Sequence, residues 1–180
     1  MENNNRPPVI LMNMAVNVIG DKECDTLKSD YAYRVSGSGA VPMLIPSIEN
    51  HIVIENLLDI ADGVLFVGGK DYPPEYYNAP AHPETRLNRL RPHFDIAFAQ
   101  SVLKRQIPVL GICAGCQLLN IVTGGKLVQH LPNAEEHRST VHTATLERSG
   151  FFSRAAGLVP GAEFTVNSFH HQAVDPEKNR

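Results

Sequence analysis

The sequence contains no tryptophan and only three cysteines in 180 residues. Two of these, Cys113 and Cys116, are too close together in the sequence to cross-link distant parts of a fold, which favours a reducing compartment. A zinc site built from four cysteines is excluded by count. No apolar stretch approaches membrane-spanning length, and the polar first residues lack the apolar core of a signal peptide. The sequence therefore predicts a cytoplasmic protein with no membrane partner.

Runs of basic residues are also absent, and 16 Lys and Arg against 19 Asp and Glu give a net charge of −3. This balance argues against nucleic acid as a partner. A hydrophobic content of 43% with 19% charged residues is ordinary for a globular protein. The length is sufficient for one domain with a sizeable core, and we expect a single domain over residues 1–180.

Short apolar runs alternate with helical patterns along the first two thirds of the chain. Strands are predicted at 8–12, 41–45, 63–67 and 109–112. Helices are predicted to begin at Asp25 or Thr26, at Asn50, at Pro92 and at Gln117. This alternation predicts a parallel sheet with helices on both faces. The segment 13–25 is predicted to be a loop.

Position within the sheet follows from the composition of each strand. Residues 63–67 are apolar throughout, which predicts a central strand, and 109–112 is predicted to be buried on both faces. Pro42 places the strand 41–45 at an edge or at a strand start. Further along, we expect a polar loop over 130–140, and then strands at 141–146 and 164–167 separated by a turn or short helix.

The segment from Pro108 to Gly125 has the pattern of a nucleophile elbow. A strand leads into a turn in which Cys113 is flanked by Gly111 and Gly115, and a helix follows. Neighbours without side chains allow a reactive residue to adopt a strained backbone conformation. The helix N-terminus also favours a thiolate. We therefore expect Cys113 to be a nucleophile.

Two other interpretations apply to this segment. A cysteine in an apolar run is more often an inert core residue. Cys113 and Cys116 also form a Cys-x-x-Cys motif, which at a helix start is typical of thiol–disulfide oxidoreductases. The flanking glycines favour the nucleophile. Gly68 and Gly69 follow the central strand at the same edge of the sheet, and they are predicted to lie near Cys113 with backbone N–H groups facing a substrate.

Four segments together resemble one family. They are residues 31–35 with 39–46, residues 62–71 with Pro74 and Tyr77, residues 108–125, and the segment 166–174, Val-Asn-Ser-Phe-His-His-Gln-Ala-Val. In this order they resemble the class I glutamine amidotransferase-like proteins, and among them the γ-glutamyl-γ-aminobutyrate hydrolases of the peptidase C26 type. The resemblance implies a flavodoxin-like three-layer sandwich with a mostly parallel central sheet.

The resemblance also implies a chemistry. Cys113 would attack a γ-glutamyl amide carbonyl and form a thioester that water then hydrolyses. The backbone N–H groups of Gly69 and Ala114 would form the oxyanion hole. The glutamyl end would be held by Gln117, Ser168 and Phe169. The expected substrate is a small γ-glutamyl amide or glutamine, with no cofactor and no metal; we attribute His130, His137 and His142 to a polar loop.

One part of the family pattern is missing. The family's catalytic base lies in a His-Pro-Glu motif beyond the segment 166–174, and the sequence ends at Arg180 before that motif. The same letters at residues 82–84 precede the elbow and are interpreted as coincidental. We expect a chain truncated at its C-terminus, a non-catalytic binding or regulatory protein, or a substitute base, with His171 and His170 as candidates. Without a base, activity should be weak or absent, because general-base help of ~10²–10⁴-fold is lost. Missing final strands would expose a sheet edge, which leads to the hypothesis of a homodimer.

Overall fold

The computed structural model describes residues 6–87 and 91–178. Contacts divide the chain into two compact units, Met1–Val128 with Val174–Arg180, and Gln129–Ala173. A single domain over 1–180 stays a prediction, because a division of contacts does not by itself define separately folding domains. None of the helices in the described ranges is both long enough and apolar enough to cross a membrane.

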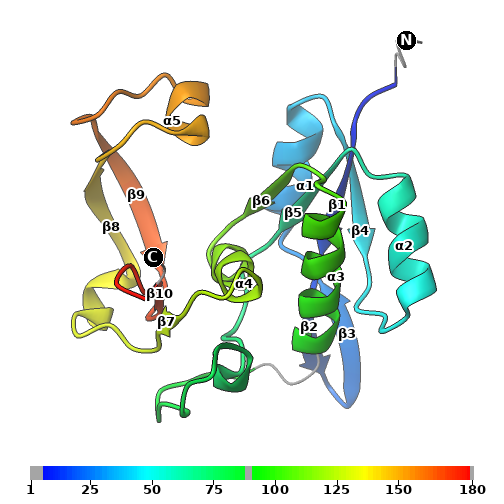
Figure 1. Cartoon of the computed structure of the whole chain (residues 1–180), viewed down its shortest axis with the longest axis horizontal. Helices are drawn as coiled ribbons and strands as arrows, with labels where there is room; N and C mark the ends of the chain where they lie inside the picture. Colours follow the sequence, from blue (N-terminus) through cyan, green and yellow to red (C-terminus); the bar gives the residue numbers. More distant parts are fainter. Residues whose placement is uncertain (1–5, 88–90, 179–180) are drawn as a thin grey trace. The chain divides into compact units, whose positions relative to one another are not determined.

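The first unit is built on a parallel sheet. Within the described residues this sheet has four strands, in the order β4 (Val41–Ile45), β1 (Val9–Asn13), β5 (Gly63–Phe66) and β6 (Val109–Gly111). Parallel neighbours need crossover connections. These contain α1 (Ser29–Gly37), α2 (His51–Asp59) and α3 (Pro92–Lys104), and α4 (Ala114–Val122) follows β6 (Figure 1). The predicted central position of β5 and edge position of β4 are confirmed.

Side chains alternate between the two faces of this sheet, and each face has its own apolar cluster. Leu11, Val64 and Phe66 pack with α2, α3 and α4, and Phe66 contacts the ring of Phe98 edge-on. The intervening residues, represented by Met12, pack with α1 on the other face. Figure 1 accordingly places α1 and α3 on opposite sides of the sheet. The predicted helices on both faces are confirmed.

The prediction of a loop over 13–25 is wrong. β2 (Ala15–Ile19) and β3 (Lys22–Thr26) pair as an antiparallel hairpin. Gly20, with a φ of 67°, provides the left-handed residue of the turn. Asn17 interrupts the apolar residues of β2, and β3 is mostly polar, so neither strand shows the continuous apolar run that identified the others.

Two predicted helix starts are also wrong. Asp25 and Thr26 lie in β3 and do not cap α1, which follows Lys28 with no side-chain cap. α4 begins at Ala114, three residues before the predicted Gln117. Its first turn consists of small residues, which resemble a loop in the sequence but permit close packing of the helix.

The strand β6 is not buried on both faces as predicted. Leu110 is 56% exposed and Ile112 is 39% exposed, although Val109 packs into the main core. Leu110 is paired with Leu65 of β5, so its side chain lies on the same face of the sheet as Leu65. At β1 and β5 this face is covered by α1. No helix of the first unit's described residues covers β6 on that side, so its outward side chains stay exposed.

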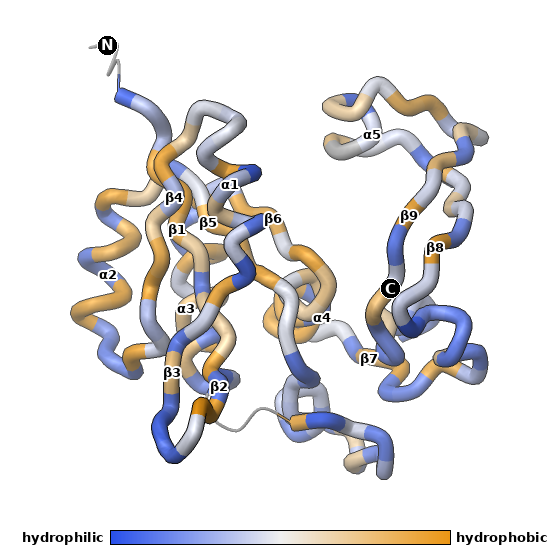
Figure 2. The backbone as a smooth tube through the Cα atoms, turned by 180° about the vertical axis from the view of Figure 1, so that it is seen from behind, coloured by the Kyte–Doolittle hydropathy of each residue, from blue (hydrophilic) through white to orange (hydrophobic). Residues whose placement is uncertain are grey.

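The second unit is a hairpin with short helical segments. β8 (Arg138–Thr145) pairs antiparallel with β9 (Glu163–Phe169), and both are longer than predicted. α5 (Phe151–Ala155) and the 3₁₀ turn η2 (Ala134–His137) belong to this unit, whereas η1 (Pro74–Tyr77) belongs to the first. β7 (Leu127–Val128) and β10 (Ala173–Val174) form a two-stranded sheet. Figure 2 shows mixed hydropathy along β8 and β9 and a mostly apolar α4.

The predicted cap of α2 is confirmed and yields a stability prediction. Asn50 Oδ1 accepts hydrogen bonds from Ile52 N at 2.9 Å and Val53 N at 3.4 Å. Replacing Asn50 by Ala removes this acceptor and should lower the free energy of unfolding by about 1 kcal/mol. Asn50→Asp keeps the acceptor and should change stability little. Urea denaturation of the three proteins measures the difference; equal loss in both variants would contradict the capping role.

Candidate active site

Cys113 occupies a strained turn between β6 and α4. Its backbone has φ 54° and ψ −113°, a region that residues with side chains rarely adopt. The turn is held by Gly115 N donating to Ile112 O at 2.9 Å and by Ile112 N donating to Phe66 O at 2.9 Å. The predicted strain at Cys113 and its place at the start of a helix are confirmed.

The two flanking glycines allow α4 to approach the sheet. A Cβ on Gly115 would lie 2.1 Å from the carbonyl oxygen of Phe66, and a Cβ on Gly111 would lie 2.5 Å from Gly115 backbone atoms. Both distances are far below van der Waals contact. Glycine is therefore required at both positions by packing of backbone on backbone, which sets the direction of Cys113.

The Gly68–Gly69 loop lies against the elbow, as the sequence predicted. A Cβ added to Gly68 would be 3.6 Å from the Cys113 Cβ and 3.1 Å from the Tyr31 hydroxyl. Gly68 N donates to that hydroxyl at 3.2 Å. The loop and the thiol-bearing turn therefore meet at the carboxyl ends of β5 and β6, where ligands bind in sheets of this kind.

Two backbone amides at this edge bind no oxygen or nitrogen of the described residues. Within the described ranges, the N–H groups of Gly69 and Ala114 donate no hydrogen bond to another backbone group or to a side-chain oxygen or nitrogen. Ala114 is the first residue of α4, so its amide has no partner inside the helix. It interacts with the Cys113 sulfur and lowers the pKa of that thiol. Free amides beside a nucleophile can stabilise an oxyanion.

The electrostatics of Cys113 differ from the expectation of a stabilised thiolate. Cys113 is exposed by surface area, yet the protein atoms around the sulfur desolvate it, and this burial raises the pKa of the thiol. The Ala114 amide and Arg91 lower the pKa, whereas Asp71 raises it further. The pKa of the thiol is raised overall, because desolvation outweighs the opposing effects of the Ala114 amide and Arg91. The thiol is protonated at neutral pH.

The other residues predicted from sequence divide between the two units. Gln117 is buried on α4, one turn beyond Cys113, so the first unit brings together Cys113, Gly69, Ala114 and Gln117. The second unit holds Ser168, Phe169, His170 and His171. Ser168 is buried with its Oγ 2.7 Å from His142 Nε2, and Phe169 is 75% exposed.

The two candidate bases have partners within the second unit. His170 Nδ1 lies 3.0 Å from Gln172 O, and burial lowers the pKa of His170. His171 Nδ1 lies 3.3 Å from His130 Nδ1. The earlier His-Pro-Glu segment lies in an exposed loop, where His82 Nδ1 accepts from Glu84 N at 3.2 Å. A local turn accounts for that segment.

Sequence reasoning missed the buried polar residues behind the loop. Asn13, Arg91 and Asp95 are almost inaccessible, with exposed fractions of 0%, 3% and 0%. Two features of the sequence could have indicated these residues. Asn13 follows an apolar strand at its carboxyl end, and Arg91 and Asp95 are spaced i, i+4 at the start of a helix.

Comparisons with known proteins identify the family of the chain. The family model described as Peptidase C26 matches residues 8–180. A glutamine amidotransferase-like protein of Mycobacterium tuberculosis is 35% identical over 162 residues, which cover 83% of this chain and 50% of that protein. The gamma-glutamyl-gamma-aminobutyrate hydrolase of Escherichia coli K12 is 28% identical, covering 97% of this chain and 74% of that protein. The chain thus spans about half the length of the mycobacterial relative.

A solved structure confirms the fold. The crystal structure of a glutamine amidotransferase from Methylobacillus flagellatus matches with a TM-score of 0.60 and 16% identity, covering 94% of this chain and 57% of that chain. The α/β fold with a parallel central sheet, predicted from the sequence, is therefore shown both by the strand order and by this neighbour.

The glycine contacts predict a difference between two alanine substitutions. Gly115→Ala forces a methyl group into the Phe66 carbonyl, and overpacking of this kind costs about 1–3 kcal/mol or more. Gly37→Ala is the matched control, because its Cβ would meet nothing within 4 Å and its φ is not positive. Thermal and urea unfolding should show a large loss for Gly115→Ala alone. Equal stability of the two variants would contradict the close packing of α4.

The raised thiol pKa predicts the pH dependence of alkylation. Iodoacetamide reacts with the thiolate, so the rate at Cys113 should rise with pH through a midpoint above that of a free thiol. Intact mass of a Cys24→Ser, Cys116→Ser variant isolates this cysteine. A midpoint below pH 7 would instead reveal a thiolate that is stabilised at rest.

Proposed function

The chain belongs to the Peptidase C26 family, and from this membership we propose that it is a cysteine-dependent hydrolase of γ-glutamyl amide bonds. The observation that supports the proposal most directly is the strained Cys113 beside the N–H groups of Gly69 and Ala114, which bind no oxygen or nitrogen of the described residues. A relative named gamma-glutamyl-gamma-aminobutyrate hydrolase, aligned over 97% of this chain, supports the substrate class.

The proposed reaction has two stages. Cys113 Sγ forms a bond to the γ-carbonyl carbon, and the carbonyl electrons move to oxygen, where Gly69 and Ala114 N–H groups stabilise the charge. Collapse of this intermediate breaks the C–N bond, and the amine leaves with a proton. Water then hydrolyses the thioester, releasing glutamate and the free thiol. Gln117, Ser168 and Phe169 are proposed to hold the glutamyl group.

The first stage needs a proton acceptor, because the raised pKa keeps the Cys113 thiol protonated. His171 and His170 are the proposed acceptors. Burial lowers the pKa of His170, so this side chain is neutral at pH 7, which is the form that accepts a proton. We expect slow turnover if neither histidine reaches the sulfur, since a general base contributes ~10²–10⁴-fold.

Two other functions remain to be separated by experiment. The protonated thiol favours a non-catalytic protein that binds γ-glutamyl compounds with the same fold. A thiol–disulfide oxidoreductase is disfavoured, because burial raises the pKa of both Cys113 and Cys116. Redox Cys-x-x-Cys pairs have a lowered pKa at the attacking thiol.

The nucleophile assignment predicts covalent labelling. A glutamine-like diazo-ketone should add one equivalent to the protein, because residues that bind the glutamyl group, as proposed, would bring its reactive carbon to Cys113. Intact mass measures the adduct. Cys113→Ala should take none, whereas Cys116→Ala is the matched control and should be labelled like the unchanged protein.

The outcomes separate the three functions. An adduct lost only in Cys113→Ala, with amine release from γ-glutamyl amides, supports the hydrolase. Binding of glutamine by calorimetry without an adduct would indicate the binding protein. A loss of two hydrogens between Cys113 and Cys116 under mild oxidant, reversed by a dithiol, would indicate the oxidoreductase.

A further inference from the structure

A buried ion pair lies directly behind the Gly68–Gly69 loop. Arg91 precedes α3, and its Nε donates to Oδ2 of Asp95, one helical turn further on. Asp95 also accepts hydrogen bonds from the Tyr72 hydroxyl at 2.6 Å and from Asn13 Nδ2 at 2.8 Å. Burial and the Asp95 carboxylate raise the pKa of Tyr72, so its hydroxyl stays protonated and donates. The carboxylate therefore has three donors.

The remaining nitrogens of Arg91 bind the loop itself. Nη2 donates to Val67 O and Nη1 donates to Gly68 O, each at 3.0 Å. A Cβ on Gly69 would lie 2.3 Å from Nη1. The guanidinium is therefore packed against the Gly69 Cα, and glycine is needed there to admit it.

The backbone N–H groups of Val67 and Gly68 are bound by side chains of other elements. Asn13, the last residue of β1, accepts from Val67 N at 2.9 Å through Oδ1. Tyr31 on α1 accepts from Gly68 N at 3.2 Å. All four backbone polar atoms of Val67 and Gly68 are thus bound by side chains, from the end of β1, from α1 and from the start of α3.

This scaffold determines the direction of the next amide. In a planar trans peptide the carbonyl of one residue and the N–H of the following residue point in opposite directions. Because Gly68 O points to Arg91, the Gly69 N–H must point away from the guanidinium. Gly69 N–H is the amide that the proposed function assigns to the oxyanion hole.

We infer that Arg91 is a positioning residue that holds the Gly68 carbonyl and thereby orients the Gly69 N–H as an oxyanion donor. The inference rests on the proposed function for its catalytic consequence. Two donors in a rigid fork are required to bind two successive carbonyls, and Lys, with one ammonium on a flexible stem, cannot reproduce that geometry.

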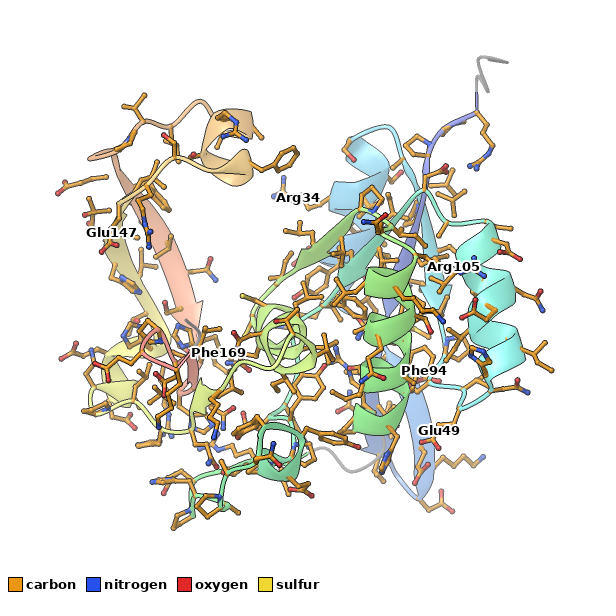
Figure 3. The ribbon with its side chains drawn as sticks, in the orientation of Figure 1. Arg34, Glu49, Phe94, Arg105, Glu147 and Phe169 are labelled. Carbon is orange, nitrogen blue, oxygen red and sulfur yellow. The ribbon has the colours of Figure 1, made fainter. Side chains whose placement is uncertain are left out.

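The test compares Arg91→Lys with Arg105→Lys. Arg105 lies just after α3 and bonds to Glu55 and Asp59 of α2, away from the loop (Figure 3). Arg91→Lys should lower kcat for a γ-glutamyl amide by about 100-fold, the usual effect of losing one oxyanion donor, with little change in KM. Alkylation of Cys113 by iodoacetamide forms no oxyanion and should keep its rate. Arg105→Lys should match the unchanged protein in all three measurements.

Tyr31→Phe provides a second variant if Arg91→Lys does not fold. It removes only the hydrogen bond to Gly68 N from a partly buried side chain, and kcat should fall in the same direction by a smaller factor. Equal kcat in the unchanged protein and in the folded Arg91→Lys variant would overturn the inference, as would an equal loss of iodoacetamide reactivity.

A nuclear magnetic resonance measurement separates failure of this inference from failure of the proposed function. If the unchanged protein shows neither turnover nor an adduct, the proposed function fails. The ¹H–¹⁵N resonance of Gly69 should nevertheless move in Arg91→Lys, or in Tyr31→Phe, and stay in place in Arg105→Lys. A Gly69 resonance that does not move in the folded loop variants would show that Arg91 does not orient this amide.

Discussion

The contact between the first turn of α4 and the carbonyl of Phe66 is the constraint on which the site depends. With only 2.1 Å from a hypothetical Gly115 Cβ to the Phe66 oxygen, the helix can start only from backbone that carries no side chain there. The chain therefore turns sharply after β6, and Cys113 takes a positive φ at a cost of about 1–3 kcal/mol. Burial of Leu118 and Ile121 on the same helix offsets that cost.

The ion pair of Arg91 and Asp95 is buried, and desolvating two charges is expensive unless their remaining polar atoms are also bonded. Here Asp95 accepts from three donors, and Arg91 donates to one carboxylate and two carbonyls. A pair of apolar residues could fill the same volume, but it could not bind the carbonyls of Val67 and Gly68. Retention of charge in the core is therefore consistent with control of the loop.

The second unit concentrates histidines in one hairpin. The ring of His137 lies 5.1 Å from that of His142 and 4.9 Å from that of His170, measured between centroids. Burial, followed by the neighbouring histidines, lowers the pKa of His170. In the part of the chain that the structure describes, no group of three or more His, Cys, Asp or Glu residues is arranged to hold a metal ion. The cluster therefore packs ring against ring, with His137 between His142 and His170.

Local patterns alone determined the parallel strands, the cap at Asn50 and the elbow around Cys113, because periodicity, a capping side chain and flanking glycines act within a few residues. They missed the hairpin β2–β3, because Asn17 interrupts the apolar residues of β2 and β3 is mostly polar. They also missed the exposure of Leu110, which depends on how far α1 extends over the sheet. The upward pKa shift of Cys113 and the binding of the Gly68 carbonyl by Arg91 were decided only by the tertiary structure. Desolvation and a hydrogen bond across 23 positions of sequence arise when elements pack, and no local signal encodes them.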